Sequence, residues 1–191
     1  MRCFIGVPLP EAWKQTLETL IRHWTPRFAT RLHWTRPETW HVTLQFLGNV
    51  DPGRVPSIAT ALARLQFPRF ALHVEGGGYF PEARQPRVGW LGFGEGTDRL
   101  ARCAQDLASL LTPLGFPAES RAFVAHATLF RVRDAAPRQD DPWQILPQQL
   151  AAMAWPPALV ERIVLWHSTL DPAGARHAPL AWVDASDAVD A

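Results

Sequence analysis

Two short segments of this 191-residue chain carry the same residue types in the same order. His41-Val42-Thr43-Leu44 occurs first, and His126-Ala127-Thr128-Leu129 repeats the pattern 85 positions later. In each segment polar and apolar residues alternate, which is typical of a β-strand with the histidine and the threonine on one face. An imidazole with a pKa near 6.5 can accept or donate a proton at neutral pH. Two such strands predict a two-histidine acid–base site.

Such a site suits displacement at phosphorus, where a nucleophile loses a proton while a leaving oxygen gains one. Each proton-transfer role contributes on the order of 10²–10⁴ in rate. The hydroxyls of Thr43 and Thr128 can donate to phosphate oxygens, and Arg131 can neutralise the charge that grows there. Phe46 and Arg131 each follow their histidine by five positions, so an unbroken strand would turn both away. Either both strands break or bulge after the leucine, or neither side chain reaches the cleft. A break is favoured because residues 47–48 already resemble a strand end, and it leaves Phe46 able to stack on a base.

Other interpretations of the same residue types stay open. A metal site would also use histidines, but the sequence has no His-Glu-x-x-His motif and no close Cys/His/Asp cluster. The remaining histidines are interpreted as structural or surface residues: His23, His33, His73, His167 and His177. A basic segment before the first motif fits either a solvated loop or a nucleic-acid backbone contact, and carries Arg27, Arg31 and Arg36. A protein that only binds RNA ends would not need a histidine pair.

Composition and charge fit a folded protein without an obvious polyanion partner. Hydrophobic residues make up 47% and charged residues 19%, with a net charge of +1. Cys3 and Cys103 form no disulfide framework, which predicts a reducing cytoplasm. No stretch reaches roughly 18 consecutive apolar residues, and the first residues are too short an apolar run for a signal peptide. We expect a cytoplasmic monomer that does not associate with membranes.

Apolar periodicity predicts strands and helices in mixed order. Strands are expected at residues 2–9, 41–47, 70–74, 87–93, about 124–132, 159–169 and 180–183, and helices after residues 10, 51 and 97. The pattern predicts an α+β fold in two lobes, with antiparallel-rich sheets, outer helices and approximate two-fold symmetry around a central cleft. Residues 1–184 would form one domain, with a surface loop at 133–147, a bend or bulge at 76–78, and a disordered tail at 185–191.

With these two motifs the chain resembles the 2H phosphoesterase superfamily, which is characterised by two His-x-Thr/Ser motifs. More closely, it resembles the RNA 2′,3′-cyclic phosphodiesterases, also called 2′-5′ RNA ligases. The matching segments are residues 2–6, 34–48, 86–92, 115–116, 126–131 and 165–170. Three positions depart from the family pattern: Ala125 replaces a usual Pro, Trp40 a smaller aliphatic residue, and Gly89 an aliphatic residue before Trp90.

The resemblance implies a fold of the 2H phosphoesterase type and a role in RNA processing, tRNA included. It implies hydrolysis of an RNA 2′,3′-cyclic phosphate to a 2′-phosphate, without metal or cofactor. A small cyclic nucleotide or a 2′-5′ oligonucleotide are alternative substrates. The family roles carried over are acid–base catalysis by His41 and His126, phosphate binding by Thr43, Thr128 and Arg131, and base stacking by Phe46.

The resemblance also bears on the direction of proton transfer. The expected split has His41 protonating the leaving 3′ oxygen while His126 assists the water. Run in reverse, the same site would join a 5′-hydroxyl to the cyclic end and form a 2′-5′ linkage.

Overall fold

The computed structural model describes residues 1–171 and 174–189. The strands are β1 (Arg2–Pro8), β2 (Leu32–Trp34), β3 (His41–Asn49), β4 (Pro68–Leu72), β5 (Val74–Phe80), β6 (Val88–Phe93), β7 (His126–Val132), β8 (Ala158–Val160), β9 (Arg162–Asp171), β10 (Gly174–Asp184) and β11 (Ser186–Val189). The helices are α1 (Glu11–Trp24), α2 (Val55–Leu62), α3 (Thr97–Leu111) and α4 (Ile145–Ala152), and short 3-10 turns connect several elements.

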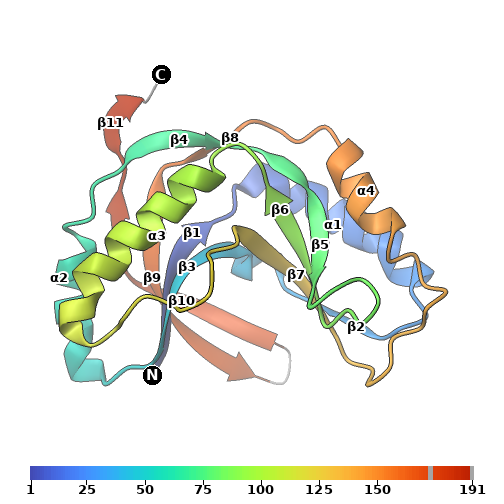
Figure 1. The fold of residues 1–191 in the computed structure, drawn as a ribbon, viewed down its shortest axis with the longest axis horizontal. Helices are drawn as coiled ribbons and strands as arrows, with labels where there is room; N and C mark the ends of the chain where they lie inside the picture. The colour runs from blue at the N-terminus through green and yellow to red at the C-terminus, as the bar shows by residue number, and fades with distance from the viewer. Residues whose placement is uncertain (172–173, 190–191) are drawn as a thin grey trace.

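Most strands join one antiparallel sheet, which positions the two motifs. Within the described residues its order is β10-β9-β1-β3-β7-β6-β5, with β2 also paired to β7 (Figure 1). The two motif strands, β3 and β7, are central neighbours joined through the pair Val42–Ala127. Beyond β3 lie β1, β9 and β10, and beyond β7 lie β6 and β5. The predicted α+β fold is confirmed; in the described part of the chain both motif strands belong to one eight-stranded sheet, and a separate three-stranded sheet has the order β11-β4-β8.

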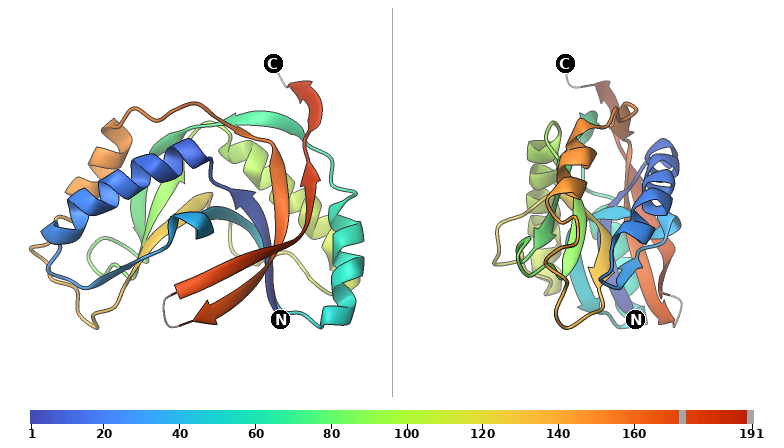
Figure 2. Two further views of the ribbon diagram at one scale, coloured as in Figure 1. Left: turned by 180° about the vertical axis from the view of Figure 1, so that it is seen from behind. Right: turned by 90° about the vertical axis from the view of Figure 1, so that its right-hand side faces the viewer.

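Burial explains why the chain forms these layers. All five residues from Cys3 to Val7 are buried, as expected for a strand that is covered on both faces. The long helices are amphipathic and bury one stripe each: Trp13, Leu17, Leu20 and Trp24 in α1, and Leu100, Cys103, Leu107 and Leu111 in α3. In the side view of Figure 2, α1 and α3 lie on opposite sides of the strands. Of the helices in the described residues, none is both long and apolar enough to cross a membrane.

Three segments differ from the sequence-based expectation. Helix α4 begins inside the predicted loop 133–147, and its Pro147 is tolerated because first-turn amides have no helical acceptor. The triple glycine 76–78 does carry a bulge, at the register shift after Val74, but β5 continues through it to Phe80. The tail predicted to be disordered from residue 185 instead forms β11 beside β4, anchored where the Ser186 amide donates to the Phe67 carbonyl at 2.9 Å. Residues 190–191 of that tail lie outside the described residues.

Candidate active site

The four polar side chains of the motifs lie on one face of the central strand pair. Val42 pairs with Ala127 and both are fully buried on the other face. The antiparallel register therefore places each histidine next to the threonine of the other motif. The motif histidines and threonines are all partly exposed. The charge of His126 is among the causes that lower the pKa of His41.

The same backbone contact orients both imidazoles. Nδ1 of His41 lies 2.6 Å from the carbonyl oxygen of Thr39, and Nδ1 of His126 lies 2.8 Å from that of Val124. A carbonyl oxygen can only accept a hydrogen bond, so Nδ1 carries the proton in each ring. The lone pair of the neutral ring is then on Nε2, which leaves both Nε2 atoms able to accept a proton.

Burial keeps both rings neutral in the unliganded site. It lowers the pKa of His41 to about 4; the Thr39 carbonyl opposes this shift, and the charges of His177 and His126 add to it. Burial also lowers the pKa of His126, opposed by the Val124 carbonyl and reinforced by the charge of Arg131. At neutral pH both imidazoles are therefore bases until an anion arrives between them.

Aromatic side chains from distant strands pack around each imidazole. Phe4 stacks on His41 with ring centroids 4.4 Å apart, and Trp166 lies 5.7 Å away. Phe80 meets His126 edge-on at 4.9 Å, with Trp90 at 6.3 Å. These rings exclude water and fix the orientation of the histidines. The sequence analysis missed this role, because no local pattern links these aromatic residues to the motifs.

A β-bulge follows the threonine in each motif strand. The β1–β3 register passes over Leu44, and the β6–β7 register passes over Leu129. Each bulge shifts the alternation by one residue, so Phe46 and Arg131 return to the face of the histidines and are exposed. Of the two irregularities that the sequence allows after the leucine, the structure has the bulge and not the favoured break, since β3 continues to Asn49 and β7 to Val132.

The segment before the first motif supports the bulge of the second. The Thr35 amide donates to the Leu129 carbonyl at 2.8 Å, and the Thr35 hydroxyl lies 2.7 Å from the Thr128 carbonyl. The indole of Trp40 donates to the same hydroxyl at 2.5 Å. Trp40 is fully buried, so its large ring, a departure from the family pattern, packs in the core and connects the two motifs.

The groups proposed to hold phosphate have no competing partner. Across residues 1–171 and 174–186, no hydrogen bond occupies the hydroxyls of Thr43 and Thr128, and no carboxylate pairs with Arg131. All three are therefore able to bind an anion. The same part of the chain brings together no group of three or more His, Cys, Asp or Glu side chains able to hold a metal ion.

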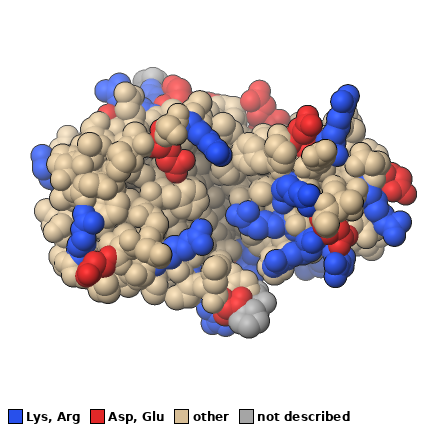
Figure 3. Space-filling model, turned by 60° about the horizontal axis from the view of Figure 1, so that its bottom comes forward, with Lys and Arg blue, Asp and Glu red and all other residues tan. Residues whose placement is uncertain are grey.

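The basic segment before the first motif is engaged within the protein. Arg31 pairs with Asp134 at 2.7 Å, Arg36 with Asp171 at 3.7 Å, and Arg27 donates to the carbonyl of His23. These contacts favour a structural interpretation of the three arginines. Figure 3 nevertheless shows Lys and Arg side chains gathered on one side of a hollow in the molecular surface.

A cavity of about 660 Å³ adjoins the motif residues. Thr43 and His126 contribute to its wall, with Phe46 and Phe80 beside them. The opposite wall is formed by α3 and by the segment 118–124. The side-chain amide of Gln45 donates hydrogen bonds to the carbonyls of residues 116 and 117, at 3.1 and 3.2 Å, and so fixes the chain just before that segment. The lining is mainly apolar, and its polar side chains beside Thr43, Gln45 and His126 are Arg87, Gln105, Glu119 and Arg121. Such a cavity suits a flat heterocycle attached to a polar group.

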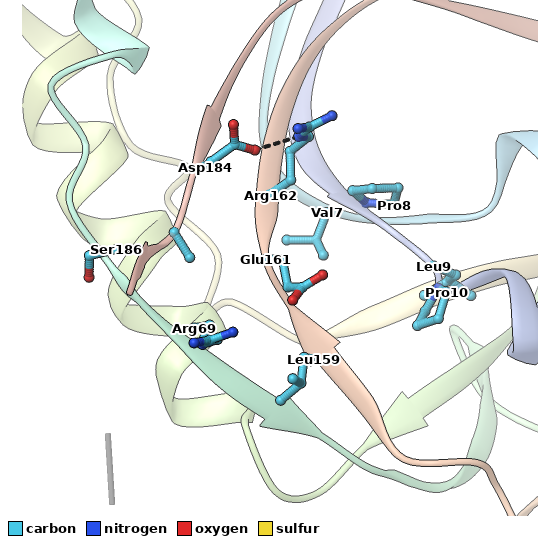
Figure 4. A pocket seen from close by; sticks show the side chains of 11 residues that line it. Val7, Pro8, Leu9, Pro10, Arg69, Leu159, Glu161, Arg162, Asp184 and Ser186 are labelled. Atoms are coloured by element: carbon cyan, nitrogen blue, oxygen red, sulfur yellow. Dashed lines mark hydrogen bonds and ion pairs between the residues drawn. The ribbon is translucent and has the colours of Figure 1, made fainter. Parts of the chain in front are cut away.

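A second cavity, of about 570 Å³, lies away from the motifs (Figure 4). Arg69, Glu161 and Arg162 line it together with residues 7–10, and Arg162 pairs with Asp184 at 2.6 Å. None of the described residues on its wall belongs to either motif. The candidate site is therefore the face that carries the two histidines.

Comparison with known proteins places the chain in a family. Residues 7–90 and 93–177 match the family described as LigT like Phosphoesterase. An RNA 2′,3′-cyclic phosphodiesterase from Thermotoga maritima is 36% identical over 178 residues, covering 91% of this chain and 90% of that protein. A protein of the same name from Thermus thermophilus is 33% identical over 189 residues, covering 91% and 85%.

Solved structures of similar proteins have the same fold as this chain. The crystal structure of TT0787 from Thermus thermophilus has a TM-score of 0.73 and 28% identity, covering 96% of this chain and 97% of that one. The apo structure of E. coli LigT shares the fold, with a TM-score of 0.73, 24% identity and 97% coverage of both chains. The chain therefore belongs to the LigT-like phosphoesterase family.

Proposed function

We propose that this protein hydrolyses RNA 2′,3′-cyclic phosphate ends to 2′-phosphomonoesters, with two histidines as acid and base and without a metal. The observation that carries the proposal is the pair of neutral imidazoles on adjacent strands, each oriented by a carbonyl at Nδ1. The relatives from Thermotoga maritima and Thermus thermophilus, which match most of this chain, are both named RNA 2′,3′-cyclic phosphodiesterase.

In this mechanism the cyclic phosphate lies between the two imidazoles. The hydroxyls of Thr43 and Thr128 donate to its non-bridging oxygens, and Arg131 stabilises the negative charge that increases there. A water oxygen attacks phosphorus and gives its proton to Nε2 of one histidine. The bond from phosphorus to the 3′ oxygen breaks, and that oxygen takes a proton from the other histidine. The product carries a 2′-phosphate and a 3′-hydroxyl, and solvent returns the two rings to their starting states.

The split of roles places His41 as the acid for the 3′ oxygen and His126 as the base for water. In the unliganded site the pKa of His41, near 4, favours the reverse order. His41 must therefore gain its proton with the substrate, whose phosphate anion raises the pKa of an adjacent imidazole.

A sulfur leaving group decides between the two orders. A cyclic phosphate with sulfur in place of the 3′ oxygen needs little protonation to leave, so it rescues the variant that lacks the acid. We expect rescue of His41→Ala and not of His126→Ala, and the opposite pattern would reverse the assignment.

The terminal nucleoside is assigned to the cavity beside Thr43 and His126. Phe46 lies on the wall of this cavity, and its side chain is 54% exposed. A base can therefore stack on the exposed ring, an interaction worth about 1–3 kcal/mol per base. RNA ends and small cyclic nucleotides both fit this arrangement, and comparing kcat/KM for an RNA and a mononucleotide separates them.

The test of the main proposal uses a short RNA with a 2′,3′-cyclic end in the presence of a chelator. We expect His41→Ala and His126→Ala each to lower turnover by at least about a hundredfold. His73→Ala is a matched control, because His73 pairs with Glu95 outside the site. Turnover within threefold of the parent in both site variants would overturn the proposal, and tight binding without product would indicate an RNA-end binding protein. The protein is proposed to act as a monomer, and ligation of a 5′-hydroxyl RNA is its reverse reaction.

A further inference from the structure

A third histidine lies against the first motif. The ring of His177, on β10, is centred 5.2 Å from His41 and 4.9 Å from Phe4, and is steeply inclined to both. Phe4 and His41 are stacked with ring centroids 4.4 Å apart and planes inclined by 29°, so His177 lies beside this stack at nearly equal distance from its two members. Nδ1 of His177 is buried without a hydrogen bond of normal geometry in the described residues.

His177 and His41 lie on strands that are not neighbours in the sheet. Strands β9 and β1 separate β10 from β3 in the sheet, so a flat sheet would hold the two strands about 14 Å apart. The rings meet because the β9–β10 hairpin projects beneath the motif strands in Figure 1 rather than continuing a flat sheet. The separation of β10 from β3 in the sheet explains why the sequence alone predicts only a structural or surface role for His177.

The hairpin is tied to the segment that also holds His41. Arg36 pairs with Asp171 at the end of β9, and Asp171 pairs with Arg176. The Arg36 carbonyl accepts hydrogen bonds from the amide and hydroxyl of Thr39, at 2.9 and 2.8 Å. Thr39 in turn provides the carbonyl that orients His41. The two contacts of His41, with the Thr39 carbonyl and the His177 ring, are thus mechanically connected.

We infer that His177 is a positioning residue for His41, which holds the His41 ring against Phe4 from the hairpin and, when His177 is itself protonated, makes it harder for His41 to take a proton. The inference depends on the proposed reaction only for its catalytic consequence. The contact between the rings is a property of the unliganded protein.

The charges around this pair are few. The charges of His177, on β10, and His126, on β7, each lower the pKa of His41. The other rings beside His41 are those of Phe4 and Trp166, which are uncharged. Near the hairpin end, Arg36 pairs with Glu38 and Asp171, Asp171 also pairs with Arg176, and His33 lies beside Gly174. Helix α2, which contacts β10, carries no titratable side chain. A unit charge on one ring changes the pKa of a ring centred 5.2 Å away by at least about half a unit, even at the dielectric constant of water.

The test measures the pKa of His41 directly. An NMR titration of the imidazole ring is carried out on the parent and on His177→Phe, which keeps an aromatic ring and removes its charge. We expect the pKa of His41 to rise by at least about half a pH unit. His167→Phe is a matched control, because His167 lies on the same hairpin at the adjacent β9 position to Trp166 and therefore on the opposite face. A shift below about 0.2 pH units in His177→Phe, or an equal shift in the control, overturns the inference.

His177→Gln provides a second variant that lacks both ring and charge, should the phenylalanine fail to fold. We expect its His41 ring to lose its fixed orientation, seen as loss of the ring-current shift from Phe4, and kcat to fall at least about fivefold with KM within twofold. An unchanged ring-current shift and kcat would contradict a positioning role. If the pKa shift is found while no variant or parent hydrolyses cyclic phosphates, the proposed function fails and the inference about His177 stands.

Discussion

The buried first histidine should make protein stability depend on pH, and this can be tested with one substitution. His41 has a pKa of about 4 in the folded protein, against about 6.5 in an unfolded chain. Between these values the unfolded chain binds a proton that the folded protein does not bind. The free energy of unfolding therefore falls as the pH is lowered from about 6.5 to about 4, and this histidine causes no further loss below that range.

The size of the effect follows from the shift. A difference of about 2.5 pKa units corresponds to about 3–4 kcal/mol at full effect, because each unit is worth about 1.4 kcal/mol. Since the His41 ring is partly exposed, solvent screening reduces this to about 2 kcal/mol. Burial lowers the pKa of His126 and His177 as well, so both contribute in the same direction.

Urea denaturation at intervals from pH 4.5 to 7.5 measures the effect as a difference between proteins, which cancels the carboxylates that titrate nearby. We expect His41→Gln to lose about 2 kcal/mol of the parent's pH dependence across this range. Asn49→Ser, at the exposed end of the same strand, is a control that should keep the parent's slope. If His41→Gln keeps that slope too, the ring is not desolvated in the folded protein and the reasoning fails.

Three further predictions concern other parts of the site. Arg131→Gln should lower kcat/KM at least about tenfold through loss of a charge-assisted phosphate contact, whereas Arg133→Gln, two residues along, should stay within about threefold. Phe46→Ala should raise KM for a cyclic nucleotide about tenfold with little change in kcat, as loss of base stacking would. Gly6→Ala should lower the free energy of unfolding by about 1–3 kcal/mol in urea denaturation, because its new methyl group would collide with the Val42 carbonyl of β3; unchanged stability would contradict the described contact between β1 and β3.

Local periodicity was sufficient to predict the motif strands. Alternation over four residues assigns the histidine and threonine to one face, and this holds for both segments in the structure. The same reasoning could not give the pairing of β3 with β7, because register depends on the whole sheet. The pair Val42–Ala127, which brings the motifs together, joins positions separated by a large part of the chain.

The bulges show how far an offset in the sequence can be interpreted. The odd spacing of Phe46 and Arg131 from their histidines correctly indicated an irregularity after each leucine. It could not distinguish a strand end from a bulge, since the difference lies in the neighbouring strands β1 and β6, whose pairing continues past the extra residue. Helix α4 was missed for a related reason, because its buried residues Leu146 and Leu150 are too few to form a clear helical stripe.

A two-histidine reaction requires two unequal histidines, although the motifs themselves are almost identical. The fold repeats the motif strand, the bulge and the carbonyl at Nδ1 on both sides of the pair Val42–Ala127. The inequality lies in what surrounds each ring. Phe4 and His177 pack against the first imidazole, whereas the edge of Phe80 and the charge of Arg131 act on the second. The proposed acid and base roles therefore depend on residues outside the motifs, which matching the motifs alone does not identify.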